Sequence, residues 1–177
     1  AIAQKSITVR ERVAPDAQRQ LLGVLVDCSG SMSGGRRIQL ALGVLTNRLE
    51  AVVKGKAEVW FGFFDSRLCG TPRLANDMIT AKLLLRDVSR NHFNGRDTAI
   101  QRCTIQFAEL LAKLDGRLPE VCVVTDGEDS VDPNEMVNAF TKLGMVLHAF
   151  VVECSNENLC DAARRTGGLA IDKFEGR

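Results

Sequence analysis

Two hydrophobic patterns alternate along this chain, and together they predict strands separated by helices. Continuous apolar runs, typical of strands buried on both faces, predict strands at 21–26, 59–64, 121–124 and 146–152, with a short last strand at 169–171. Between them, apolar residues recur at the i, i+3, i+4, i+7 spacing of amphipathic helices. This spacing predicts helices over 38–53, 76–89, 100–114, 132–144 and 156–165.

Residues with strong local preferences refine several of these boundaries. Gly70 and Pro72 predict that 68–74 is a turn followed by a short edge strand, because proline cannot donate to an inner ladder. Asn76 is the expected cap of the helix that follows it. The sequence Asp132-Pro133-Asn134-Glu135 combines an acidic cap, proline at the first helical position and a capping-box glutamate. Gly144 is expected to end that helix.

The order of these elements indicates an α/β domain with a doubly wound, mostly parallel sheet and one short antiparallel edge strand. Apolar strands that alternate with helices require helices on both faces of the sheet. Such sheets bind ligands beyond the carboxyl ends of their strands. We therefore expect the functional residues where the strands 21–26 and 121–124 end.

Length and charge bound the domain organisation and the classes of partner. A chain of 177 residues fits one domain. We assign it to 20–177, and we interpret the charged segment 1–19 as a linker or edge segment. The formal net charge of +1 gives no field toward nucleic acid or an anionic membrane. No apolar run reaches the roughly 18 residues of a membrane-spanning helix. We therefore expect neither nucleic acid nor a membrane as a partner.

Oxygen donors are concentrated at the predicted functional edge. Asp27, Ser29 and Ser31 form a D-x-S-x-S sequence directly after the first buried strand. Thr98 precedes the helix at 100–114, and Asp126 follows the strand at 121–124. Carboxylate and hydroxyl oxygens are the ligands that hard cations such as Mg²⁺ and Mn²⁺ prefer. The five residues together predict a metal site.

Each of these segments also has a plain structural interpretation. Asp97 or Thr98 could serve only as a helix N-cap, and Asp126-Gly127 only as a turn. The serines after Asp27 could belong to an ordinary strand-to-helix turn. The coincidence of all three at strand ends favours the metal site.

At these residues the chain resembles the von Willebrand factor A family. The metal-ion-dependent adhesion site of that family uses D-x-S-x-S after the first strand, a threonine in a second loop and an aspartate in a third. The matching residues here are Asp27, Ser29, Ser31, Thr98 and Asp126, and the resemblance extends over residues 20–173. The family usually has a plainer glycine-rich stretch where this chain has Arg96-Asp97.

The resemblance implies how the site would work. The hydroxyls would bind Mg²⁺ or Mn²⁺ directly, with Ca²⁺ as a further alternative, and one or both carboxylates would act through water. An Asp or Glu of a partner protein would complete the ion's coordination. Arg36 and Arg37 would attract such a partner, or would simply be solvated. Intracellular members of the family often work with an ATPase or a multi-subunit assembly, which is the partnership expected here.

Two alternatives to this interaction module stay open. The metal could be purely structural within the same fold, or the edge could belong to a metal-dependent hydrolase. The hydrolase lacks a clear base: Glu128 and Asp129 are expected to face solvent, His148 to lie in the core and His92 at an exposed helix end. We therefore expect a binding protein rather than an enzyme.

The cysteines indicate a compartment. The chain has six, with no C-x-x-C pair and only two histidines, a pattern that argues against a zinc site. Cys28, Cys103 and Cys122 fall at apolar positions, where free cysteine packs as a small hydrophobe. We interpret all six as reduced thiols of a cytoplasmic protein, rather than as three disulfides of a secreted one.

Overall fold

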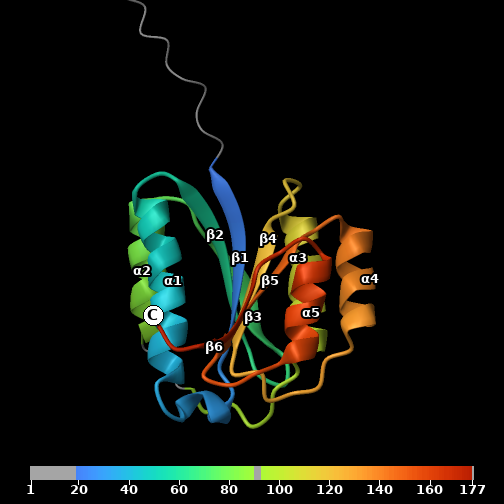
Figure 1. The fold of residues 1–177 in the computed structure, drawn as a ribbon. Helices are drawn as coiled ribbons and strands as arrows, with labels where there is room; N and C mark the ends of the chain where they lie inside the picture. Colours follow the sequence, from blue (N-terminus) through green and yellow to red (C-terminus); the bar gives the residue numbers. More distant parts are fainter. Residues whose placement is uncertain (1–18, 90–92, 177) are drawn as a thin grey trace, which may run out of the picture.

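The computed structural model describes residues 19–89 and 93–176. The predicted segment 1–19, apart from Arg19, and His92 lie outside these residues. The elements in chain order are β1 (Gln20–Asp27), η1 (Gly30–Ser33), α1 (Arg37–Val53), β2 (Ala57–Phe64), β3 (Leu68–Ala75), α2 (Met78–Ser89), α3 (Ile100–Leu114), β4 (Glu120–Thr125), α4 (Pro133–Leu143), β5 (Leu147–Val152), α5 (Glu157–Arg165) and β6 (Ala170–Phe174) (Figure 1).

The strands form one sheet in the order β3-β2-β1-β4-β5-β6. All neighbouring pairs are parallel except β2 and β3. The predicted fold class is therefore confirmed, including the antiparallel edge strand. β3 spans the whole segment predicted as a turn and strand, since an edge position tolerates Gly70 and Pro72.

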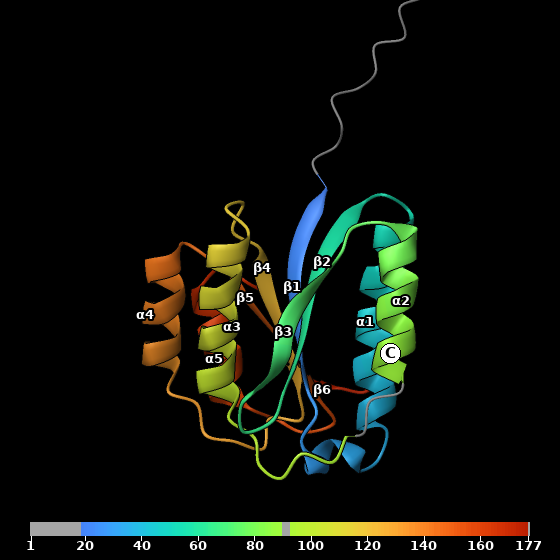
Figure 2. The same ribbon diagram turned by 180° about the vertical axis from the view of Figure 1, so that it is seen from behind.

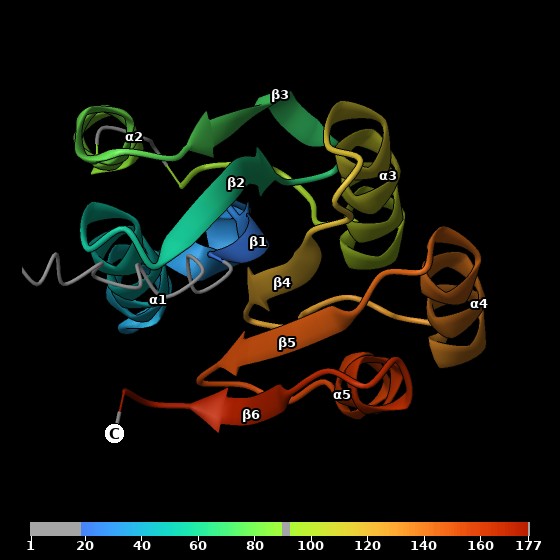
Figure 3. The same ribbon diagram turned by 90° about the horizontal axis from the view of Figure 1, so that it is seen from above.

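Helices cover both faces of the sheet, as Figure 3 shows. α1 and α2 pack on one face around a core that includes Val24, Leu45 and Leu84. α3, α4 and α5 pack on the other around a core that includes Phe107 and Phe140. Seen from behind, α3 lies beside β3 and β2 (Figure 2).

Glycine permits the close approach of α3 to the centre of the sheet. A Cβ atom on Gly23 of β1 would lie 2.4 Å from Leu111 and 3.0 Å from Phe107, both on α3. A larger residue at position 23 would therefore force the side chains of Leu111 and Phe107 to repack.

Local capping residues set the helix ends, with one departure from prediction. The Asp132 carboxylate caps α4 at the backbone N–H groups of 134 and 135, and Gly144 ends that helix with a φ of 67°. For α2, the cap is Asp77 and not Asn76, because the Thr80 N–H donates to Asp77 Oδ1 at 2.7 Å. Within the described residues, every helix is too short or too polar to cross a membrane.

Candidate metal centre

The carboxyl ends of β1 and β4 bring two aspartates to the same edge of the sheet. β1 and β4 are adjacent and parallel, so Asp27 and Asp126 leave the sheet on the same side. Both side chains are completely buried. The loop after β1 continues into η1, which lies at this edge in Figure 1.

The β1–η1 loop folds around the Asp27 carboxylate. The Ser29 N–H donates to Asp27 Oδ1 at 2.8 Å. The Ser29 and Ser31 hydroxyl oxygens lie 3.1 Å apart. The two serines of the D-x-S-x-S sequence thus present their oxygens together, next to the carboxylate.

Thr98 reaches the same carboxylate from the second loop. Its hydroxyl donates to Asp27 Oδ2 at 3.3 Å. The segment that carries Thr98 is held against the first loop, because the Gly30 N–H donates to the Gly95 carbonyl at 2.6 Å and the Gly95 N–H to the Cys28 carbonyl at 3.1 Å. The backbone of both loops therefore fixes where Thr98 lies.

Thr98 and Asp97 do not cap the helix that follows. α3 begins at Ile100 with Ala99 in the N-cap position and no side-chain cap of its own. The Ile100 N–H donates instead to Asp129 Oδ2 at 2.9 Å. Since a distant aspartate caps α3, the Thr98 hydroxyl is free to contact Asp27, and the plain N-cap interpretation of Thr98 is wrong.

Asp126 has a charged neighbour that the sequence did not reveal. Arg37 Nη1 lies 3.0 Å from Asp126 Oδ2, 3.0 Å from Glu128 Oε1 and 2.9 Å from the Ser31 carbonyl. Arg37 Nε lies 3.6 Å from Glu153 Oε2. The Arg37 side chain is thus held inside the site and is only 18% exposed, so its interpretation as a merely solvated charge is wrong. Arg36 is exposed.

Thr125 is a further residue that sequence reasoning missed. Its hydroxyl donates to Asp27 Oδ2 at 2.6 Å, and its oxygen accepts the Gly127 N–H at 3.0 Å. A threonine at the end of an apolar strand gives no signal in the sequence. Only the pairing of β1 with β4 places it beside Asp27.

The electrostatics of Asp27 suit a cation. Burial raises the pKa of this carboxyl above its ordinary value, the hydrogen bonds from Ser29 and Thr125 oppose that rise, and the nearby Asp126 charge adds to it. Its hydrogen-bond donors are a backbone N–H and two neutral hydroxyls.

The donor set fits a hard divalent cation. Three hydroxyl oxygens and two carboxylates come from three separate segments and meet at one edge, and all are oxygen ligands. The buried charge of Asp27 would be stabilised by such an ion. Asp126 is engaged by Arg37, which suits a role through water rather than direct contact.

Comparison with solved structures identifies the fold. A BatB protein from Bacteroides thetaiotaomicron superposes with a TM-score of 0.67 at 18% identity, covering 88% of this chain and 91% of that one. A von Willebrand factor type A protein from Catenulispora acidiphila superposes with a TM-score of 0.67 at 19% identity. The match covers 88% of this chain and 39% of the Catenulispora chain. This chain has a von Willebrand factor A-like fold.

A third relative of the same fold has a metal in its adhesion site. Proximal thread matrix protein 1 of the mussel byssus was solved with zinc in its metal-ion-dependent adhesion site (MIDAS) motif. It superposes with a TM-score of 0.62 at 14% identity. The match covers 88% of this chain and 44% of that protein. Neither a protein-family model nor a curated protein matches the sequence.

Proposed function

We propose that this domain is a metal-dependent protein-interaction module. In this proposal a Mg²⁺ or Mn²⁺ ion at the carboxyl edge of the sheet binds an Asp or Glu side chain of a partner protein. The observation that carries it is the gathering of hydroxyl oxygens from two loops around the fully buried Asp27 carboxylate. A von Willebrand factor A-like relative with a zinc-occupied MIDAS adds support.

The residues would divide the work by their chemistry. Ser29, Ser31 and Thr98 would offer neutral hydroxyl oxygens, while Asp27 would offer negative charge next to them. Asp126 would contact the ion through a water molecule, because the Arg37 guanidinium already neutralises its carboxylate. When bound, the ion supplies an electrophilic position that a partner carboxylate can fill.

Arg37 would favour an acidic partner indirectly. By pairing with Asp126, it removes one negative charge that would otherwise offset the ion. The ion would then keep more of its positive charge toward an incoming carboxylate. Arg37 thus supports the acidic-partner proposal from inside the site rather than by touching the partner.

We propose binding rather than catalysis at this edge. His148, the one described histidine, has Nε2 2.7 Å from Glu120 Oε2 and accepts the Leu169 N–H at Nδ1. It lies near the start of β5, away from the carboxyl ends of the strands. The proposal predicts no turnover of phosphoesters or esters with Mg²⁺ or Mn²⁺.

The setting proposed for the module is the cytoplasm, with a multi-subunit assembly or an ATPase as the partner. All six cysteines are free, and Cys69 is exposed, which supports a reducing compartment. The type of assembly rests on the resemblance to intracellular relatives alone.

The decisive experiment measures metal binding and partner capture on the same proteins. Wild type, Asp27→Ala and the control Asp161→Ala are titrated with Mn²⁺ by calorimetry, then used as bait in native extract with Mg²⁺ or with EDTA. Asp161 is an exposed aspartate of α5 in a surface ion pair with Arg165, so its loss leaves the edge of the sheet intact.

We expect Mn²⁺ binding and one Mg²⁺-dependent partner with wild type and Asp161→Ala, and neither with Asp27→Ala. Replacing the acidic residues of that partner should abolish its capture. Capture that is indifferent to EDTA and to Asp27→Ala would overturn the docking role. If EDTA instead lowers the melting temperature steeply without affecting capture, the ion is structural.

A further inference from the structure

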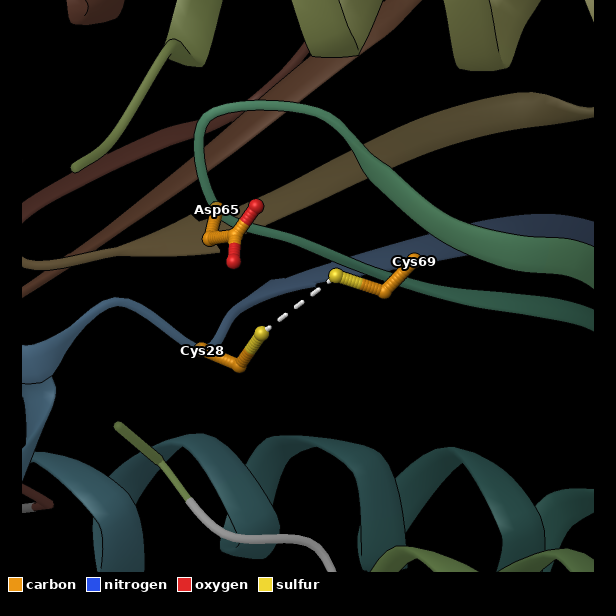
Figure 4. Close-up of side chains that lie close together, drawn as sticks. All are labelled: Cys28, Asp65 and Cys69. Atoms are coloured by element: carbon orange, nitrogen blue, oxygen red, sulfur yellow. Dashed lines mark hydrogen bonds between the residues drawn. The ribbon is translucent and has the colours of Figure 1, made fainter. Parts of the chain in front are cut away.

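Two cysteines and an aspartate lie close together where β1 and β2 end, and none of them belongs to the oxygen site described above. They are Cys28 in the β1–η1 loop, Asp65 in the β2–β3 turn and Cys69 in β3. One ligand atom from each residue lies within 4.8 Å of the others. Figure 4 shows both sulfur atoms and one carboxylate oxygen pointing into the same space.

The spacing of the two sulfur atoms is that of zinc ligands. Cys28 Sγ and Cys69 Sγ are 3.8 Å apart. Two Zn–S bonds of about 2.3 Å at the tetrahedral angle place their sulfur atoms about 3.8 Å apart. The thiol pair therefore already has the separation that a tetrahedral ion requires, and a carboxylate oxygen of Asp65 lies within 4.8 Å of both sulfur atoms.

The aspartate is oriented by its own turn. Asp65 Oδ1 accepts the Arg67 N–H at 3.1 Å and the Ser66 hydroxyl at 3.4 Å. Such hydrogen bonds to a carboxylate are the usual way in which proteins orient a metal ligand. Gly95 packs against the same side chain: a Cβ there would lie 2.7 Å from Asp65 Cβ.

Backbone pairing holds the three ligands in place. The Cys28 N–H donates to the Phe64 carbonyl at 2.8 Å, and the Ala99 N–H donates to the Asp65 carbonyl at 2.9 Å. Cys69 pairs with Phe63 across β2 and β3. The cluster is thus built on strand ends, which vary less in position than free loops do.

The cluster is open on one side. Cys28 is 6% exposed, whereas Cys69 is an exposed residue of the edge strand. An ion can therefore enter past Cys69, and a water molecule can take a fourth position. Three protein ligands and an open position are a recurrent zinc arrangement.

We propose that Cys28, Asp65 and Cys69 form a second metal site, for a thiophilic divalent cation of the Zn²⁺ class. Thiolate ligands select Zn²⁺ and similar ions over Mg²⁺, which prefers oxygen. The two sites therefore differ in chemistry and share no ligand. Because Cys28 lies between Asp27 and Ser29, a bound ion would tie the β1–η1 loop to the β2–β3 turn.

The test uses Co²⁺ as a spectroscopic stand-in for Zn²⁺ on the reduced protein. Thiolate coordination to Co²⁺ gives a charge-transfer absorption that oxygen ligands do not give. We expect one equivalent of Co²⁺ to produce this band and one equivalent of Zn²⁺ to remove it. Cys69→Ala should abolish the band, and Asp65→Asn should weaken Co²⁺ binding by at least about tenfold.

Two controls separate this site from the other thiols and from the oxygen site. Cys122→Ala removes a buried thiol of β4 and should leave the band unchanged. Asp126→Ala alters the oxygen site and should also retain it. A missing band in wild type, or a band that survives Cys69→Ala, would overturn the proposal whatever the outcome for Mg²⁺.

A second measurement needs no variant. Zn²⁺ should protect Cys69 in the wild-type protein from alkylation by iodoacetamide and should prevent air oxidation of the pair to a disulfide, both read by peptide mass spectrometry. Equal alkylation of Cys69 with and without Zn²⁺, or a Cys28–Cys69 disulfide that forms equally fast in both, would overturn the proposal.

Discussion

Two buried aspartates at opposite edges of the same sheet are stabilised in opposite ways. Asp115 lies between α3 and β4, near the amino ends of the strands, and is 8% exposed. Asp27 lies at the carboxyl end of β1 and is completely buried. Each accepts several hydrogen bonds, so the difference between them lies in the charge of the donors.

Asp115 is neutralised by the chain itself. Its Oδ2 accepts Arg117 Nη2 at 2.9 Å and Trp60 Nε1 at 3.0 Å, and its Oδ1 accepts Arg117 Nε at 3.0 Å. Arg117 also pairs with Glu58. The Arg117 hydrogen bonds lower the pKa of Asp115 to about 2, although burial opposes them.

Asp27 has no such partner among the described residues. Serine and threonine donors surround it, the guanidinium of Arg37 pairs with Asp126, and burial raises the pKa of Asp27. A carboxylate paired with arginine has its counter-charge within the chain, whereas one that is buried among neutral hydroxyls would be stabilised by a bound cation. This contrast separates a structural aspartate from the proposed metal ligand.

The largest effect should come from removing the charge of Asp27. Asp27→Ala should weaken Mn²⁺ binding by more than about 100-fold, because both the carboxylate and the orientation of Ser29 are lost. Isothermal calorimetry measures this directly, with Asp115→Asn as the matched control. Wild-type affinity in Asp27→Ala, or equal losses in both variants, would break the contrast.

Without metal, the substitution of Asp115 should destabilise the fold more than the substitution of Asp27. In EDTA at pH 7, Asp115→Asn should lower the free energy of unfolding by about 1–2 kcal/mol, because it removes the charge of a buried carboxylate that pairs with a half-exposed arginine. Asp27→Asn should change it by less than about 1 kcal/mol or raise it, since a desolvated charge disappears while hydroxyls remain as partners. Urea unfolding of both variants measures these changes. A larger loss of unfolding free energy in Asp27→Asn than in Asp115→Asn would contradict the contrast between the two aspartates.

Acid should reveal the Asp115 pair. The folded-state pKa of about 2 lies below the ordinary value of 3.8, so the pair stabilises the fold fully above pH 3.8 and loses this contribution as the pH falls toward 2. Since Arg117 is half exposed, we expect a loss of about 1–2 kcal/mol. Asp115→Asn should lack this component when melting is followed against pH, and an identical pH profile would contradict the assignment.

The smallest effect concerns Arg37. Arg37→Gln should strengthen Mn²⁺ binding by about three- to tenfold, because a positive charge next to the site is removed and Asp126 becomes available. Calorimetry in low salt measures the change, with Arg165→Gln on α5 as the control. Weaker binding in Arg37→Gln would mean that Arg37 positions Asp126 rather than opposing the ion.

The sequence determined the sheet and the place of its functional edge. Buried parallel strands need continuous apolar runs, and their carboxyl ends meet on one side. For that reason Asp27, Ser29, Ser31 and Asp126 could be assigned to one edge without coordinates, and the resemblance to the von Willebrand factor A family added Thr98. Their metal binding stays a prediction.

Only the tertiary structure decided which side chains meet across the chain. Arg37 pairs with Asp126, 89 positions away, and Thr125 reaches Asp27 over 98 positions. Cys28 and Cys69, 41 positions apart, meet because β1 ends beside the β2–β3 turn. From the sequence, the lack of a C-x-x-C pair argued against a zinc site, because the proximity of these two distant cysteines leaves no local pattern. Local spacing fixes helices, strands and caps, but strand register and loop packing set contacts between distant residues, and no local pattern encodes them.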